Sequence, residues 1–309
     1  MDKKTERLVN VARMYYEQDR TQSEIADQYG ISRPMVSKLL KEARDKGIVT
    51  IRISAPQEES GGALSLMELV GRCFAIYDGV AVPDGPNDQT TNEAVAEAAI
   101  SYLSGLGGTG LGIGWGHIIG DVVKHMEQRE TLVPIGTFVC PLIGNGGVGL
   151  KNYHSNELVR SIAEHSGAQP RFIYSPACVL SEQELKLTRE LDSYHEIYHV
   201  WEKLDVALVN IGNFPSVPDF ASEARYGDQL IRQKAVGRIL NYFMDSQGHI
   251  IRSDTDYAIQ IPLELLTRTR HVVGICSANT SPKAFRAALK TGYLKHFIAP
   301  EHVVREALE

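Results

Sequence analysis

The sequence has few cysteines, no long apolar run and no strong excess of either charge. Cys73, Cys140, Cys178 and Cys276 lie far apart without C-x-x-C spacing, so they predict neither a zinc site nor a disulfide framework, and we expect reduced packing residues. No apolar stretch approaches the roughly 20 residues of a transmembrane helix. The N-terminus, MDKKTERLVN, lacks the apolar run of a secretory signal. We therefore expect a cytoplasmic protein with no membrane partner.

What is present is a chain long enough for a substantial core. The 309 residues, 43% hydrophobic and 23% charged, are typical of a globular protein with one large domain or two ordinary ones. The net charge of −6 is unevenly distributed. Residues 1–54 hold eleven Lys or Arg against eight Asp or Glu, a balance of +3, which leaves −9 for the rest. The N-terminal part is therefore the one that suits a polyanion.

Residues 1–54 carry the pattern of a helix-turn-helix. Apolar residues at helical spacing predict a first helix from Lys3 to Gln18. A capping box in TQSE, between Thr21 and Glu24, predicts the start of a second helix, and Gly30 supplies the positive φ of the following turn. A third helix is expected after a Ser32 cap, with Pro34 in its first turn and its end at Gly47.

The segment IVTIRI (48–53) alternates apolar and polar residues, which predicts a short strand, the wing of a winged helix-turn-helix. In this geometry the start of the third helix enters the major groove of double-stranded DNA. Arg33 is our first candidate for reading a guanine, because its planar fork matches O6 and N7. The predicted DNA-binding residues are Thr21, Gln22, Ser32, Arg33, Pro34, Met35, Ser37, Lys38, Lys41 and Arg52. The alternative is a small three-helix interaction domain without a DNA role.

The stretch TQSEIADQYGISRPMVSKLLKEARDKGIVTIRI resembles the N-terminal domain of the SorC family of bacterial sugar-responsive transcriptional regulators. This resemblance implies operator DNA as a partner and a homo-oligomer, dimeric or tetrameric. The segment 55–62 (APQEESGG) mixes Pro, Gly, Ser and acidic residues, which predicts a linker between a DNA-binding domain at 1–54 and an effector-binding domain at 63–309.

Beyond the linker, apolar runs alternate with helical patterns. The runs at 75–82, 109–113, 133–139, 205–211, 271–276 and 295–299 predict strands. This alternation predicts a Rossmann-like α/β domain with a mostly parallel sheet covered on both faces. Ligands of such sheets bind where the strands end, and Gly-rich loops follow several of these runs, including GIGWGHIIG at 112–120. That loop does not fit G-x-G-x-x-G in any register, which argues against a dinucleotide cofactor.

The same loops resemble the sugar-binding domain of the SorC family, whose fold is shared with sugar-phosphate isomerases, through GIGWG, DVALVNIG and AVGRILNYFMDSQG. The resemblance implies a small, often phosphorylated sugar as effector. Three departures put the phosphate in question. His117 and Ile118 stand where the family has Arg or Ser and then Thr. Ser277–Ser281 replaces a Gly-Gly-x-x-Lys loop, with Lys283 two residues later, and NIGNF replaces Gly-Ile-Gly.

The candidate effector contacts come from these loops. Asp245 could accept from sugar hydroxyls, Trp115 could equally be a core residue, and Asp245 could equally satisfy its own turn. The predicted residues are Gly114, Trp115, Gly116, His117, Asn145, Gly146, Gly147, Asn213, Asp245, Asn279, Ser281 and Lys283.

The segment HEIYH (195–199) spells the H-E-x-x-H of zinc proteases. It lies in the helical pattern LTRELDSYHEIYHVWEKL, where we expect an ordinary surface helix with Leu191, Tyr194, Tyr198 and Trp201 as its apolar side, and no metal.

Two functions follow from the sequence. The first is a transcriptional regulator of a carbohydrate-utilisation operon, not an enzyme, whose operator affinity depends on a small sugar or sugar phosphate. The second is a sugar-phosphate isomerase or deaminase fused to a DNA-binding domain, with Asp245 as its base.

Overall fold

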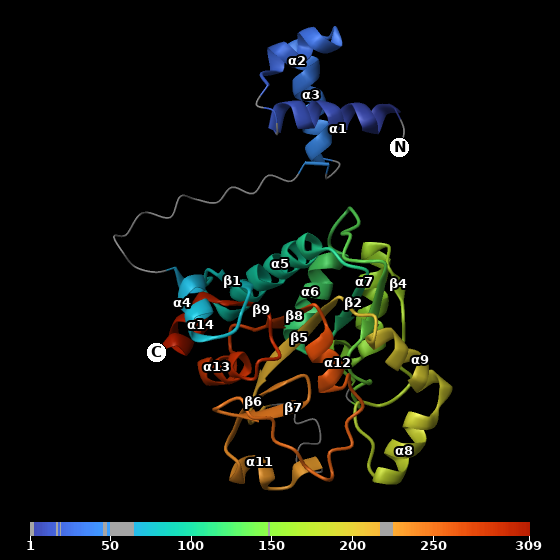
Figure 1. Cartoon of the computed structure of the whole chain (residues 1–309), viewed down its shortest axis with the longest axis vertical. Coiled ribbons are helices and arrows are strands. Elements are labelled where there is room, and N and C mark those ends of the chain that lie inside the picture. Colours follow the sequence, from blue (N-terminus) through green and yellow to red (C-terminus); the bar gives the residue numbers. More distant parts are fainter. Residues whose placement is uncertain are drawn as a thin grey trace. The chain divides into compact units, whose positions relative to one another are not determined.

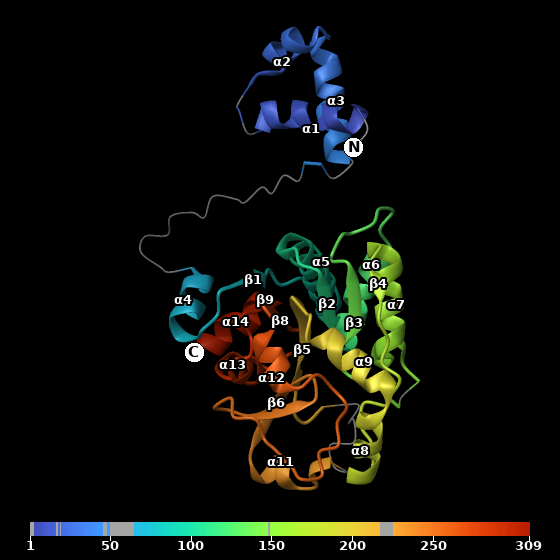
Figure 2. The same cartoon turned by 45° about the vertical axis from the view of Figure 1, so that its right-hand side comes forward.

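The computed structural model of the chain describes residues 3–16, 18, 20–45, 48–49, 65–147, 149–216 and 225–309. They belong to two compact units, Met1–Ala63 and Leu64–Glu309, each with its own hydrophobic core (Figures 1 and 2). The predicted linker, 55–62, and most of the predicted wing, including Arg52, lie outside the described residues. Among the described residues, no helix is both long and apolar enough to cross a membrane.

The first unit contains the three predicted helices, α1 (Lys3–Tyr16), α2 (Gln22–Tyr29) and α3 (Arg33–Asp45). The predicted capping box is present, because Thr21 Oγ1 accepts from the Glu24 N–H (3.3 Å) and Glu24 Oε2 accepts from the Thr21 N–H (2.8 Å). Gly30 follows α2 with a φ of 61°, as the tight turn requires. The apolar sides of the helices meet in one core around Val11, Ile25, Val36 and Leu40.

The second unit is built on a parallel sheet in the order β1-β9-β8-β5-β2-β3-β4, with a small antiparallel hairpin attached to β5. The strands of the parallel sheet are β1 (Asp78–Val82), β2 (Gly110–Ile113), β3 (Phe138–Pro141), β4 (Gln169–Pro170), β5 (Val206–Asn213), β8 (His271–Ile275) and β9 (His296–Pro300). The hairpin consists of β6 (Ala235–Ile239) and β7 (Tyr242–Asp245). The predicted α/β class with a mostly parallel sheet is confirmed.

Helices cover both faces of this sheet (Figure 2). One face packs against α5 (Asp88–Leu106), α6 (His117–Glu127) and α7 (Ser155–Ser166). The other packs against α4 (Leu66–Cys73), α9 (Asp192–Trp201), α12 (Leu263–Arg268), α13 (Pro282–Lys290) and α14 (Glu301–Leu308). Along β5, Ala207 and Val209 point into one core while Val206 and Leu208 point into the other, which explains why the strand is apolar throughout.

The order of the strands creates one point where the winding changes direction. From β2 the chain proceeds outward to β3 and β4, and it then returns to the other side of β2 with β5 and continues outward to β8 and β9. The loops after β2 and β5 therefore diverge to opposite faces of the sheet. In open α/β sheets a ligand binds at this crevice, at the carboxyl ends of the strands.

Several expectations needed correction. Residues 133–137 precede β3 rather than belonging to it, and the β6–β7 hairpin was not expected. The helical pattern predicted for 187–204 divides at Leu191 into α8 (Glu182–Glu190) and α9. Leu191 was expected to pack on the apolar side of one helix, but it is 51% exposed. Cys73 is exposed, because it ends α4 at the surface, so it is not a core residue as we had expected; Cys140 and Cys276 are buried.

Candidate functional site

The first unit presents one side of α3 to solvent. The residues that pack inward, Val36, Leu40 and Ala43, are at most 2% exposed. Between them the helix exposes every described α3 residue that was predicted to contact DNA. These are Arg33, Pro34, Met35, Ser37, Lys38 and Lys41, together with the preceding Ser32.

Arg33 also lies beside the start of α2. Together with Thr21 and Gln22 it lines an open groove, to which Tyr15, Tyr16, Arg20 and Ser23 contribute. Three of the predicted DNA contacts, from two different helices, are thus brought together at one surface. A cationic guanidinium beside hydroxyl and amide groups is the chemistry that contacts phosphates and base edges of DNA.

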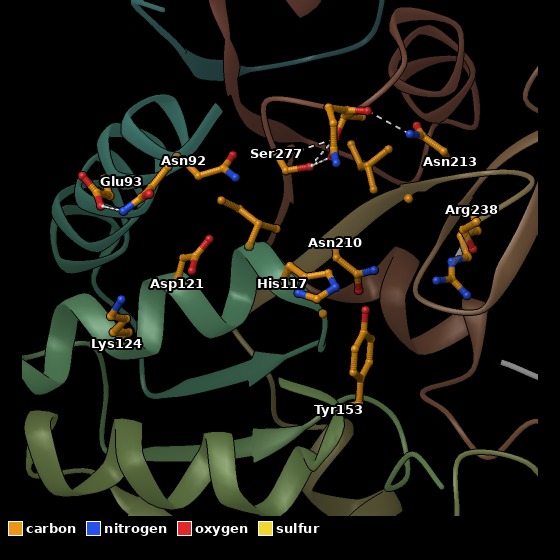
Figure 3. A pocket seen from close by; sticks show the side chains of 18 of the residues that line it. Asn92, Glu93, His117, Asp121, Lys124, Tyr153, Asn210, Asn213, Arg238 and Ser277 are labelled. Atoms are coloured by element: carbon orange, nitrogen blue, oxygen red, sulfur yellow. Dashed lines mark hydrogen bonds between the residues drawn. The ribbon is translucent and has the colours of Figure 1, made fainter. Parts of the chain in front are cut away.

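The second unit contains a cavity of about 690 Å³ at the carboxyl ends of β2, β5 and β8, where the winding of the sheet changes direction (Figure 3). Its walls come from α5, the start of α6, the end of β5, the hairpin and the loop after β8. The described lining residues are mostly polar: Gln89, Asn92, Glu93, Gly116, His117, Ile118, Asp121, Lys124, His125, Tyr153, Asn210, Ile211, Gly212, Asn213, Pro215, Ser216, Arg238, Ser277, Asn279 and Thr280.

The helix α6 begins at this cavity. Gly116 precedes it with a φ of 108°, a conformation that favours glycine, and its N–H donates to the Asn152 carbonyl (2.8 Å). The N-cap residue, Gly116, has no side chain with which to cap this helix end. Since His117 and Ile118 line the cavity, the positive end of the helix dipole faces the cavity.

Asn210, on β5, lies at the centre of the cavity wall (Figure 3). It is 7% exposed, and its Oδ1 has no hydrogen-bond partner among the described residues. A Cβ on Gly114 would lie 2.8 Å from this oxygen, so Gly114 is needed for the close approach of β2 to the Asn210 side chain. A buried, unpaired carbonyl oxygen favours a ligand that can donate a hydrogen bond.

The hairpin brings a buried cation to the same wall. Arg238 on β6 lies opposite Gly212 on β5 in the antiparallel register, and a side chain at position 212 would crowd the guanidinium group. Arg238 is 6% exposed. Its Nη1 donates to Asn241 Oδ1 (3.3 Å), which orients the guanidinium. Figure 3 shows Arg238, Asn210 and Tyr153 on one side of the cavity.

The opposite side carries acidic groups. Glu93 on α5 and Asp121 on α6 line the cavity near Lys124, and the Gln89 amide donates to Glu93 Oε1 (3.0 Å). Burial raises the pKa of the Asp121 carboxyl, and the Lys124 ammonium opposes that rise. The cavity therefore offers both hydrogen-bond donors and acceptors.

The loop after β8 uses its polar groups internally. The Ser277 N–H donates to Thr280 Oγ1 (2.9 Å), and Ser277 Oγ donates to Asn279 Oδ1 (2.6 Å). Asn213 fastens this loop to β5, because its Nδ2 donates to the Asn279 carbonyl (2.8 Å) and its Oδ1 accepts from the Ser281 N–H (2.7 Å). Asn213 and Asn279 line the cavity as predicted, yet the amide of Asn213 is engaged in the protein itself.

Four of the predicted effector residues line the cavity: Gly116, His117, Asn213 and Asn279. Trp115 does not, because its ring is buried in the core against Tyr153. Asn145 packs the loop after β3 onto α7, accepting from the Asn156 N–H and donating to the Ile173 carbonyl (both 3.3 Å). The Gly146 N–H donates to the Tyr153 carbonyl (2.8 Å), and Gly146 gives Trp115 and Tyr153 the room to pack.

Asp245 also lies away from the cavity. Its Oδ1 accepts from the N–H groups of Gln247 (2.8 Å) and His249 (3.0 Å), so it satisfies its own turn, the alternative considered above. Ser281 caps α13, and the exposed Lys283 and Gly147 are likewise absent from the cavity lining.

The H-E-x-x-H segment lies on α9, whose buried side is formed by Ile197 and Trp201. His195 and His199 are exposed, and His199 Nδ1 pairs with Glu202 (2.8 Å). No three His, Cys, Asp or Glu side chains of the described residues are grouped as metal ligands.

Asn210, Arg238 and Asp121 are among the cavity residues that the sequence did not lead us to predict. An Asn and an Arg inside otherwise apolar strands were detectable signals, since a buried strand seldom carries them without a partner. Asp121 gave no signal, because a carboxylate on an amphipathic helix usually faces solvent.

Comparisons with known proteins agree with this architecture. A family model described as "Putative sugar-binding domain" matches residues 59–309, and one described as "Sigma-70, region 4" matches residues 5–46. The sorbitol operon regulator of Klebsiella pneumoniae is 30% identical over 300 residues, 93% of this chain and 92% of that protein. The deoxyribonucleoside regulator of Bacillus subtilis (strain 168) is 27% identical over 99% of this chain and 98% of that protein.

Solved structures give the same result. The full-length sorbitol operon regulator SorC from Klebsiella pneumoniae has a TM-score of 0.71 and 26% identity, with both chains covered completely. Two units of this kind, in this order, with matches to both, identify the chain as a member of the SorC family of sugar-binding transcriptional regulators.

Proposed function

We propose that this chain is a cytoplasmic DNA-binding regulator of a carbohydrate-utilisation operon. Its operator affinity is controlled by a small carbohydrate in the cavity of the second unit. The observation that carries this proposal is the polar cavity at the β2–β5 crevice, in a chain whose first unit exposes a helix suited to the major groove. The proposal extends the family membership to a binding mode and to named residues.

Arg33 reads a guanine through O6 and N7, and Ser37, Lys38 and Lys41 contact phosphates. Besides Arg33, the segment Ser32–Lys38 contains five exposed residues that are candidates for DNA contact: Ser32, Pro34, Met35, Ser37 and Lys38. In a homo-oligomer, two α3 helices fit successive major grooves, roughly one DNA turn apart, on a pseudo-palindromic operator.

The effector acts by linkage. A carbohydrate changes operator affinity if it binds one arrangement of a dimer or tetramer more tightly than another. The cavity is lined by residues of α5, α6, β5, the hairpin and the loop after β8, so a bound molecule would join segments that are far apart in the chain.

The experiment compares Arg33→Ala and Lys41→Ala in operator titrations at several salt concentrations. Arg33→Ala should cost about 1–3 kcal/mol of specific binding while largely sparing nonspecific binding. Lys41→Ala should weaken binding to all sequences and reduce the salt slope by about one. Unchanged operator affinity of Arg33→Ala would refute the base-reading role.

The competing function is an isomerase or deaminase acting on a sugar phosphate. Asp245, the residue considered as the base of such an enzyme, accepts two hydrogen bonds from its own turn and lies outside the cavity lining. The enzyme hypothesis therefore has no support from the base that the sequence suggested. Incubating the purified protein with sugar phosphates tests it directly. Detectable turnover would contradict a purely regulatory role.

A further inference from the structure

The cavity combines a buried hydrogen-bond acceptor with a balanced set of charges. We propose that the effector is a neutral, unphosphorylated sugar or polyol, and that Asn210 determines this preference by accepting a hydrogen bond from one of its hydroxyl groups. This inference rests on the proposed function and names the class of ligand that the cavity takes.

Asn210 brings a hydrogen-bond acceptor to the cavity wall. Its Oδ1 is buried without a partner among the described residues, so a ligand group that donates a hydrogen bond to it would be favoured. A hydroxyl group supplies one. A phosphate group at neutral pH carries about −1.5 to −2 charges and mainly offers acceptor oxygens, so it would face this carbonyl oxygen with lone pair against lone pair.

The charged side chains of the cavity are of both signs. The described lining residues include two basic side chains, Lys124 and Arg238, and two acidic side chains, Glu93 and Asp121, so the formal charges of these four residues sum to zero. A dianionic ligand would be attracted by one pair and repelled by the other in a partly desolvated site. Hydroxyl groups both donate and accept, so a polyol can pair with all four residues.

The loop after β8 is a place where free backbone N–H groups would be able to hold a phosphate. These groups are engaged elsewhere. The N–H groups of Ser277, Ala278 and Ser281 donate to side-chain oxygens of Thr280, Asn92 and Asn213, at 2.9, 2.7 and 2.7 Å. The following helix, α13, is capped by Ser281 and begins with Pro282, which has no N–H.

The start of α6 has no side-chain cap from its N-cap residue, Gly116, and its N–H groups can donate to hydroxyl oxygens as well as to an anion. The acceptor side chains near the start of α6 favour a hydroxyl group over an anion. Asn210 and Asp121 come from β5 and α6, so a ligand at this helix end meets acceptors as well as donors.

The experiment is isothermal titration calorimetry on the full chain with matched pairs. D-sorbitol, D-mannitol, D-fructose and D-glucose are compared with their 6-phosphates, and inorganic phosphate is the anion probe. We expect one or more neutral compounds to bind at least tenfold more tightly than the corresponding phosphate ester. An ester that binds as tightly as its parent sugar, or more tightly, would overturn the proposal.

Two variants test the role of Asn210. Asn210→Ala should weaken the neutral ligand roughly 2- to 12-fold, the loss of one hydrogen bond. Asn210→Asp keeps an acceptor and adds a negative charge, so the neutral ligand should bind within about threefold of wild type, whereas a phosphorylated ligand would lose much more. Gln247→Glu, an exposed residue outside the cavity lining, controls for the added charge.

The melting temperature of each variant shows whether it is folded. The comparison of neutral compounds with their phosphate esters uses the wild-type chain and does not depend on any variant. If Asn210→Asp abolishes binding of the neutral ligand while Gln247→Glu does not, Asn210 is not the acceptor. If no compound of either class binds or changes operator affinity, the proposed function itself fails. A preference for esters would instead overturn the ligand class alone.

Discussion

Asn213 was predicted to contact the effector, whereas the structure shows its amide joining the end of β5 to the loop before α13. The perturbation is Asn213→Ala. It removes two hydrogen bonds, to the Asn279 carbonyl (2.8 Å) and from the Ser281 N–H (2.7 Å). Each is worth about 0.5–1.5 kcal/mol. Since the side chain is half-buried and water can replace part of the loss, we expect a total of about 1–2 kcal/mol.

For a domain of this size, 1 kcal/mol corresponds to roughly 2–4 °C, so the melting temperature of the second unit should fall by roughly 2–8 °C. Urea denaturation monitored by circular dichroism gives the free energy of unfolding directly. Lys283→Ala, an exposed change in the first turn of the same α13, is the matched control and should stay within about 0.5 kcal/mol of wild type.

Effector binding separates the two roles of Asn213. If it holds the loop, Asn213→Ala lowers stability and changes effector affinity less than Asn210→Ala does. The reasoning would be refuted if Asn213→Ala were as stable as Lys283→Ala and yet lost effector affinity tenfold, because that pattern belongs to a ligand contact.

Three further outcomes are expected. Burial lowers the pKa of both His271 and His296 below the ordinary value of 6.5, so the unfolded chain binds more protons than the folded chain. The free energy of unfolding should therefore fall as the pH drops through about 6.5. Urea titrations between about pH 7.5 and 5.5 that show no such fall would contradict this. Asp245→Ala should cost about 1–2 kcal/mol of stability by removing two turn hydrogen bonds but leave effector affinity unchanged, which calorimetry would disprove by finding a weaker ligand. Gly120→Ala should destabilise by about 1–3 kcal/mol, because its Cβ would lie 2.2 Å from Asn152 Oδ1, and a melting temperature equal to that of wild type would show that Asn152 moves aside freely.

Local rules were sufficient for much of this fold. The capping box at Thr21, the left-handed Gly30 and the apolar spacing of α3 each depend on residues within one or two turns, so the first unit could be predicted element by element. The parallel sheet was also predictable, because strands buried on both faces are apolar throughout. The β6–β7 hairpin was missed, since neither its loop nor its pattern carries a strong turn signal.

The cavity could be predicted less completely. Gly116 and His117 were identifiable, since a Gly-rich turn between a strand and a helix faces the ligand in this class of fold. Asp245 was assigned wrongly, because the same D-S-Q-G sequence can bind a ligand or its own backbone. Asn145 was also assigned wrongly, because its partners, Asn156 and Ile173, follow it by 11 and 28 residues.

The helix-turn-helix and the α/β class of the larger domain could be predicted from the sequence alone, since they follow from periodicity, capping and turn chemistry within short segments. Tertiary structure alone decided which polar side chains meet at the cavity. Asn210 on β5 and Arg238 on β6 lie on one side of the cavity, and Asp121 on α6 lies on the opposite side. Strand order and strand pairing bring these residues together. Long-range packing decides whether a polar side chain lines the cavity or faces solvent, and no local pattern in the sequence encodes that outcome.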